Sequence, residues 1–206
     1  MSVMARSVHD LTAYASENRV KYLFFWGHQP ERDGSVGAGC LSQWWPSSFE
    51  ADGEEFASAE HYMMWRKAVL FDDDAMAGRI LSAPHPKVAK TLGGRVSGFR
   101  QEVWDAHRYE IVVSGNRAKF GQHDALRDFL LTSGDRVLVE ASPLDRIWGI
   151  GLSRDDPAAA DPRRWRGTNL LGFALMDVRE SLVTVGHGQA GDRLGAVELQ
   201  QAEQHG

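Results

Sequence analysis

The chain contains a single cysteine, Cys40, and this scarcity excludes several classes of protein. No disulfide can form within the chain, so it is not a small secreted domain held together by disulfides. The histidines and Cys40 show none of the spacings typical of a zinc site, and Cys40 has no neighbour that would activate its thiol. We therefore expect no metal and no other cofactor.

Long hydrophobic runs and excess positive charge are also missing. The first ten residues have no apolar core fit for a signal peptide, and no apolar run approaches the ~20 residues of a membrane helix. The formal net charge is -5, which argues against a broad basic face for gripping DNA but leaves a local basic pocket possible. No apolar surface stripe is clear. We expect a cytoplasmic protein with no membrane association and no stable protein partner.

What is present fits a globular protein of one domain. The 206 residues are 43% hydrophobic and 25% charged, which is enough for a sizeable core. We predict an α+β fold, compact and mostly helical, with a small β-hairpin or sheet. Residues 1–19 form a short helix or a loose arm, residues 20–185 form the domain, and residues 186–206 form a disordered tail.

Local signals place the secondary structure. Residues 20–26 (VKYLFFW) are β-branched and aromatic, as in a strand. Residues 27–39 hold four glycines and form a long loop of the kind that is often functional. Residues 49–56 form a hairpin, because Asp52-Gly53 suits a type I′ turn. A further strand is predicted at residues 136–140. The predicted helices cover about residues 59–71, 72–81 (with Asp72-Asp73-Asp74 at its N-terminus), 86–93, 99–119, 124–132 and 170–182.

The helix that Ser58 caps carries an acid and a base on one face. Glu60, Met64 and Lys67 are spaced by four and seven residues, which returns them to the same side. Glu60 and Lys67 are therefore a candidate catalytic pair. On spacing alone, an ordinary surface charge pair explains the pattern better.

The segment 142–151 (SPLDRIWGIG) is a second candidate site. Asp145 and Trp148 on a loop made possible by glycines could face a ligand, with the carboxylate on sugar hydroxyls and the indole on a base. A turn with an aspartate cap and a core tryptophan explains the segment equally well.

Two other features suggest nucleotide binding. Aromatic faces stack on nucleobases, but most of the seven tryptophans are expected to fill the core. Arg95, after a glycine pair, could contact a phosphate, although a plain surface arginine is the default.

The order of these motifs along residues 22–182 resembles the NADAR family, also called YbiA-like. The family is associated with N-glycosidase chemistry on ribosylated bases and with a mostly helical α+β fold. The blocks that carry the resemblance are residues 41–46 (LSQWWP), 49–62 (FEADGEEFASAEHY), 89–95 (AKTLGGR), 118–131 (AKFGQHDALRDFLL), 138–151 (LVEASPLDRIWGIG) and 167–180 (GTNLLGFALMDVRE).

The resemblance assigns roles to individual residues. It implies Glu60 as the main catalytic carboxylate, with Lys67 and Asp145 as further catalytic groups. Gln43 stands where the family usually has asparagine, so its contact with the ligand differs. The loop 154–166 is longer than in short members, which fits a solvated insert. The residues implied in substrate binding are Phe25, Gln43, Arg95, Trp104, Trp148, Gly149 and Asn169.

The resemblance implies hydrolysis of a bond between ribose and nitrogen. The substrate is either ADP-ribose on guanine in nucleic acid or a phosphoribosylamino-pyrimidine of riboflavin synthesis. Glu60 or Asp145 stabilises the positive charge at the anomeric carbon, and Trp104 or Trp148 stacks on the base. A Schiff base on Lys67 is a second route. A module that binds ADP-ribose or a nucleotide without catalysis is the alternative function.

Overall fold

The main sheet joins two strands that lie far apart in the sequence. The computed structural model describes residues 5–184. Strand β1 (Tyr22–Phe25) pairs in parallel with β4 (Val137–Glu140), with Phe25 opposite Glu140 at the end of the register. Because parallel strands run in the same direction, the chain leaves both of them at the same edge of the sheet. The loop after β4 therefore starts beside the end of β1.

A two-residue turn closes the predicted hairpin. Strands β2 (Phe49–Ala51) and β3 (Glu54–Phe56) are antiparallel, and the turn residues Asp52 and Gly53 have φ angles of 51° and 83°. Positive φ at both positions is what a type I′ turn requires, so this prediction is confirmed. The rings of the paired Phe49 and Phe56 lie 5.8 Å apart and are buried.

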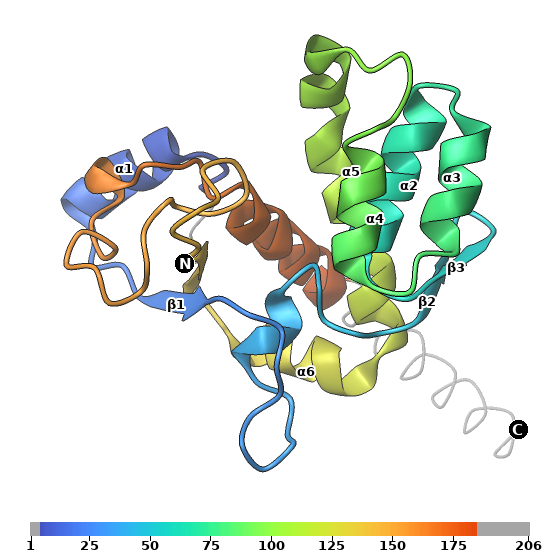
Figure 1. Cartoon of the computed structure of the whole chain (residues 1–206). Helices are drawn as coiled ribbons and strands as arrows, with labels where there is room; N and C mark the ends of the chain where they lie inside the picture. Colours follow the sequence, from blue (N-terminus) through green and yellow to red (C-terminus); the bar gives the residue numbers. More distant parts are fainter. Residues whose placement is uncertain (1–4, 185–206) are drawn as a thin grey trace, which may run out of the picture.

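Four helices form one side of the molecule, with α2 in contact with the other three (Figure 1). The Ser58 side chain accepts a hydrogen bond from the His61 N–H and caps α2, as predicted. Helix α5 continues through Gly115, where a Cβ would collide with the Tyr62 ring of α2. This glycine permits close helix packing and does not end the helix. The bounds are α2 (Ala59–Leu70), α3 (Asp74–Leu81), α4 (Pro86–Gly93) and α5 (Gln101–Gln122).

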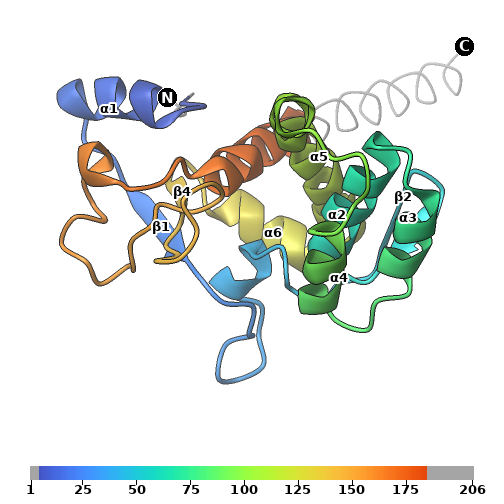
Figure 2. The ribbon, with the colours of Figure 1, turned by 45° about the horizontal axis from the view of Figure 1, so that its top comes forward.

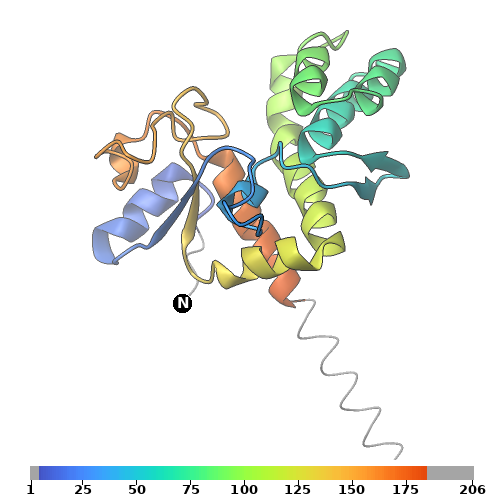
Figure 3. The same cartoon turned by 60° about the horizontal axis from the view of Figure 1, so that its bottom comes forward.

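The last helix joins the two sides of the molecule. It starts at residue 170 and continues to residue 184, and it lies between the β1–β4 pair and the helices α2 to α5 in all three views (Figures 1, 2 and 3). Its Gly172 packs directly on the Leu138 carbonyl of β4, where a side chain would collide. Helix α6 (Asp124–Thr132) connects α5 to β4. The predicted α+β, mostly helical fold is confirmed.

The N-terminal segment contains a helix that is packed against the domain. Helix α1 (Val8–Glu17) contacts the short helix η2 (Pro162–Arg164), and Leu11 is fully buried. Of the two expectations for residues 1–19, the short helix agrees with the structure. The predicted tail at 186–206 lies outside the described residues. No helix within residues 5–184 is both long and apolar enough to cross a membrane.

Candidate functional site

A small polar hollow lies at the end of β4. It has a volume of about 50 Å³, enough for a few water molecules but far below the several hundred Å³ of a typical ligand pocket. The start of α2, helix α4, the loop after β4 and the first turn of the last helix meet there. We call it the Glu60 hollow. Its lining residues are Ser42, Gln43, Trp44, Glu60, Met63, Lys90, Glu140, Asp145, Trp148 and Leu171.

Glu60 is a buried acid in the first turn of α2. It is 3% exposed, and its N–H donates to the Gln43 carbonyl at 2.9 Å. The pKa of Glu60 is raised to about 7, mainly by burial and to a smaller extent by the nearby Asp145 charge. The charge of Lys90 and a hydrogen bond with the Trp44 side chain act in the opposite direction. Glu60 is therefore a carboxyl that can both hold and release a proton near neutral pH.

Glu140, the last residue of β4, is a second acid in the hollow that the sequence analysis did not single out. Its Oε2 is buried and has no hydrogen-bond partner among the described residues. Burial raises the pKa of Glu140 to about 8, and the charges of Asp145 and Glu60 add to the effect while Lys90 opposes it. The available signal was an acidic residue at the end of the apolar run VLV (residues 137–139).

Lys90 of α4 supplies the positive charge of the hollow. It lowers the pKa of both Glu60 and Glu140. It lies in the block AKTLGGR, in which only Arg95 was predicted to contact a ligand. In the described part of the chain, no group of three or more His, Cys, Asp or Glu side chains is arranged to hold a metal ion.

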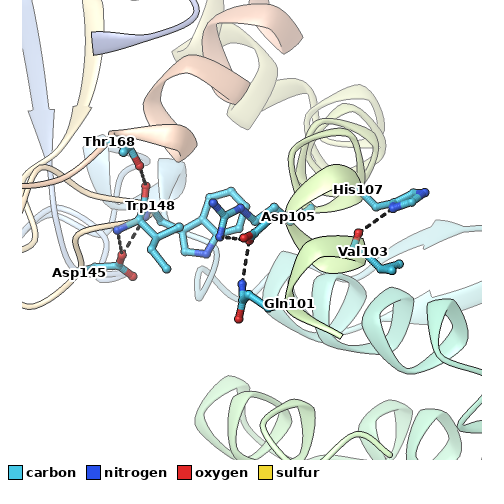
Figure 4. A network of polar contacts seen from close by, with 9 residues as sticks. Gln101, Val103, Asp105, His107, Asp145, Trp148 and Thr168 are labelled. Atoms are coloured by element: carbon cyan, nitrogen blue, oxygen red, sulfur yellow. Dashed lines mark hydrogen bonds and ion pairs between the residues drawn. The ribbon is translucent and has the colours of Figure 1, made fainter. Parts of the chain in front are cut away.

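Asp145 both shapes the loop after β4 and lines the hollow. Its Oδ1 accepts hydrogen bonds from the N–H groups of Ile147 and Trp148 at 2.9 and 2.8 Å (Figure 4). The Thr168 hydroxyl donates to the Ile147 carbonyl at 2.6 Å and anchors the same loop. One oxygen of the Asp145 carboxylate therefore caps the turn, while Asp145 and Trp148 also line the hollow. The turn-capping and ligand-facing interpretations of this segment are compatible.

Three residues that were predicted to bind substrate do not line the hollow but help to position a residue that does. Asn169 is fully buried, and its Oδ1 accepts from the Glu140 N–H at 3.0 Å while its Nδ2 donates to the Leu138 carbonyl at 2.9 Å. A Cβ at Gly149 would lie 2.8 Å from the Glu140 carbonyl oxygen. Phe25 is buried opposite Glu140 in the sheet. Asn169 and Gly149 thus contact the backbone of Glu140, and Phe25 belongs to the strand that pairs with it.

Helix α5 holds the segment that carries Gln43. The Asn116 amide donates to Gln43 Oε1 at 2.8 Å, and Lys119 Nζ donates to the carbonyls of Cys40 and Ser42 at 2.7 and 2.9 Å. Lys119 is fully buried, which lowers its pKa to about 7. Gln43 thus lines the hollow, with its side-chain oxygen occupied by Asn116.

Comparisons with known proteins agree with this architecture. Residues 24–183 match the NADAR domain. The chain belongs to the NADAR family. The N-glycosidase R617 of Acanthamoeba polyphaga mimivirus is 43% identical over 165 residues, which cover 78% of this chain and 95% of the relative. The N-glycosidase YbiA of Escherichia coli is 31% identical over 138 residues, which cover 67% of this chain and 76% of the relative.

A solved structure has the same fold. The NMR structure of the Escherichia coli protein YbiA matches with a TM-score of 0.63 and 25% sequence identity. The match covers 82% of this chain and 89% of YbiA. The family resemblance and the mostly helical α+β fold expected from the sequence are therefore confirmed.

Three residues that the NADAR resemblance places in the site lie away from the lining of the hollow. Lys67 follows Glu60 by two helical turns, about 10 Å along the axis of α2. Its Nζ lies 4.1 Å from the Phe99 ring centroid and 5.5 Å from that of Trp104, and burial lowers its pKa. Trp104 is buried, and Arg95 is exposed after α4. The structure brings Lys67 and Trp104 together, apart from Glu60 and Asp145.

Proposed function

We propose that this chain is an N-glycosidase that hydrolyses the bond between a ribose and a nitrogen base. The observation that carries the proposal is the buried Glu60 carboxyl, which shares a small hollow with Asp145, Glu140 and Lys90. The N-glycosidase names of NADAR relatives support the same reaction.

The chemistry of the hollow suits this reaction. Breaking the ribose–nitrogen bond builds positive charge on the anomeric carbon, and a carboxylate beside that carbon stabilises the charge. Glu60 takes this role and activates the attacking water. Asp145 uses one oxygen for its turn and has the other for the ribose hydroxyls. Trp148, at the edge of the hollow, offers a face for the base.

The size of the hollow limits what it holds. About 50 Å³ accommodates the reacting atoms and water, and the remainder of a nucleotide has to lie outside. Exposed Arg95 is available for a phosphate there. We propose as substrates either ADP-ribose linked to guanine in nucleic acid or a phosphoribosylamino-pyrimidine.

The position of Lys67 favours attack by water over a Schiff base. Its ammonium group packs on Phe99, and its Cα lies about two helical turns from that of Glu60. We expect that borohydride added during turnover traps no covalent adduct. An adduct that disappears in Lys67→Met would establish the lysine route instead.

The proposal is tested by a hydrolysis assay with both substrates. Glu60→Gln keeps the shape of the side chain and removes its charge, so release of sugar should fall by about 10³-fold or more. Glu55→Gln, at an exposed position of β3, is the matched control and should keep full activity. The substrate that is hydrolysed faster identifies the branch of the family to which this chain belongs. Tight ADP-ribose binding without turnover of either substrate would show a binding module instead.

A further inference from the structure

The loop after β4 is clamped to the segment that precedes the last helix. The Arg166 N–H donates to the Ile150 carbonyl at 2.9 Å, and the Thr168 N–H donates to the Arg146 carbonyl at 3.0 Å. Gly167 lies so close to this loop that a Cβ on it would be 2.7 Å from the Arg146 Cα. The backbones of Arg146 and Arg166 are therefore held side by side, although the two residues belong to different segments.

The two arginine side chains also pack on the same glycine. A Cβ on Gly151 would lie 3.0 Å from the Arg166 Cβ and 3.1 Å from the Arg146 Cγ, so both side chains start next to one point of the loop. Gly151 has a φ of 67°, a conformation that favours glycine, and its missing side chain leaves room for both arginines. Both arginines remain exposed, so solvent and solutes can reach them.

No carboxylate neutralises this arginine pair. Arg163, earlier in the same segment, forms an ion pair with Asp161 at 2.9 Å. Within residues 5–184, by contrast, the guanidinium groups of Arg146 and Arg166 take part in no hydrogen bond and no ion pair. Asp145, directly before Arg146, uses Oδ1 to cap its own turn. Two unpaired positive charges that start side by side repel each other, and an anion that accepts hydrogen bonds from both removes this repulsion.

The arginine pair lies beside the Glu60 hollow. Asp145 lines the hollow, and the Cα of the next residue, Arg146, is only about 3.8 Å further along the chain. A ribose with its C1′ at Glu60 has to carry the substituent on O5′ outside the hollow, because about 50 Å³ holds only the reacting atoms. A phosphate on O5′ is therefore placed where long side chains from the loop after β4 can reach it.

We propose that Arg146 and Arg166 form a binding site for the phosphate on the ribose O5′ of the substrate. This inference rests on the proposed N-glycosidase function. A phosphate ester on O5′ is present both in a phosphoribosylamino-pyrimidine and in ADP-ribose, and planar guanidinium groups donate paired hydrogen bonds to its oxygens. The phosphate is remote from the bond that breaks, so its contacts are equal in the ground state and the transition state. The site should therefore lower KM and leave kcat almost unchanged.

Two substrates that differ only in the 5′-phosphate test the site. In the double variant Arg146→Gln, Arg166→Gln, KM for the phosphorylated substrate should rise by about 10- to 100-fold while kcat stays within about twofold. Both constants for the substrate without phosphate should stay unchanged. Replacement of both arginines by lysine keeps the charges but not the planar donors, and should recover part of the affinity. Arg164→Gln, exposed in the same segment, removes one charge as a control and should affect neither substrate. Circular dichroism checks that all variants fold.

Binding measurements separate this site from the proposed reaction. Isothermal titration calorimetry with ribose 5-phosphate and with ADP-ribose should show that the wild type binds at least one of them about tenfold or more tightly than the double glutamine variant. The compound that loses affinity shows whether the site takes a monophosphate or a diphosphate. This loss in a protein that hydrolyses no ribosylated base would support the site and overturn the N-glycosidase function alone.

Other outcomes would overturn the site and leave the N-glycosidase function intact. These are no binding of either compound to the wild type, equal affinities of the wild type and the double glutamine variant, or equal increases in KM for the two substrates. An increase in KM for the phosphorylated substrate that occurs in Arg95→Gln but not in the double variant would assign the phosphate to Arg95 instead.

Discussion

At the scale of single residues, the hollow places acids where burial disfavours their charge. Glu140 has a pKa of about 8 in the folded protein against an ordinary value of 4.5. Between these two values the folded state binds more protons than the unfolded state, so stability falls as the pH rises through this window. The site thus reduces stability at the pH where its carboxyls must exchange protons.

This linkage predicts the effect of Glu140→Gln on stability. The amide cannot ionise, so the variant escapes the loss that the wild type undergoes between about pH 5 and pH 8. We expect the difference in free energy of unfolding, variant minus wild type, to increase by on the order of 1–3 kcal/mol over this range. Urea denaturation at pH 5, 6.5 and 8 measures it, with exposed Glu55→Gln as the control. A difference that does not change with pH would show that Glu140 is ionised throughout.

At the scale of elements, helix α5 contains two glycines with opposite roles. A Cβ at Gly115 would collide with the Tyr62 ring, whereas a Cβ at Gly121 would have nothing within 4 Å. We expect Gly115→Ala to lower the free energy of unfolding by about 1–3 kcal/mol and Gly121→Ala to raise it by about 0.5–1 kcal/mol. Denaturation of the two variants side by side measures both signs. Equal effects would mean that α2 and α5 are less closely packed than described.

Helix α5 also positions residues that line the hollow. Asn116 is fully buried and holds Gln43 Oε1, and the Gln43 carbonyl in turn accepts from the Glu60 N–H. Asn116→Ala should cost about 1–3 kcal/mol in stability and, by displacing Glu60, on the order of tenfold in kcat. Ser114→Ala, exposed on the same helix, should change neither quantity. Loss of stability with unchanged kcat would show that Gln43 does not position Glu60.

Local signals in the sequence predicted the elements but only part of the site. Asp52-Gly53 and the Ser58 cap depend on neighbouring residues alone, and both predictions are confirmed. Glu140 was missed because its surroundings depend on how α2, α4 and the distant β1 meet at the end of β4, and local sequence signals predict these elements but not their contacts. Lys67 shows the opposite limit. Periodicity places it on the same face of α2 as Glu60, but its packing against Phe99 and Trp104 depends on tertiary contacts that periodicity does not give.

At the scale of the whole molecule, the last helix connects parts that are distant in the chain. Its Asp177 accepts a hydrogen bond from the Tyr109 hydroxyl of α5 at 2.9 Å and pairs with Arg6, before α1, at 3.1 Å. The first turn of this helix lines the hollow through Leu171. The N-terminal segment, α5 and the hollow are thus attached to one element, so a disturbance of α1 should reduce the stability of the domain as a unit.

Leu11→Ala tests whether α1 belongs to the cooperative fold. The NADAR match begins at residue 24, yet Leu11 is fully buried and α1 contacts η2. Removing a buried leucine side chain leaves a cavity and costs about 2–5 kcal/mol, whereas His9→Ala, exposed on the same helix, should cost almost nothing. Urea denaturation followed by circular dichroism and by tryptophan fluorescence should show one shifted transition with both probes. A loss confined to a minor early transition would mean that α1 detaches while the rest of the domain stays folded.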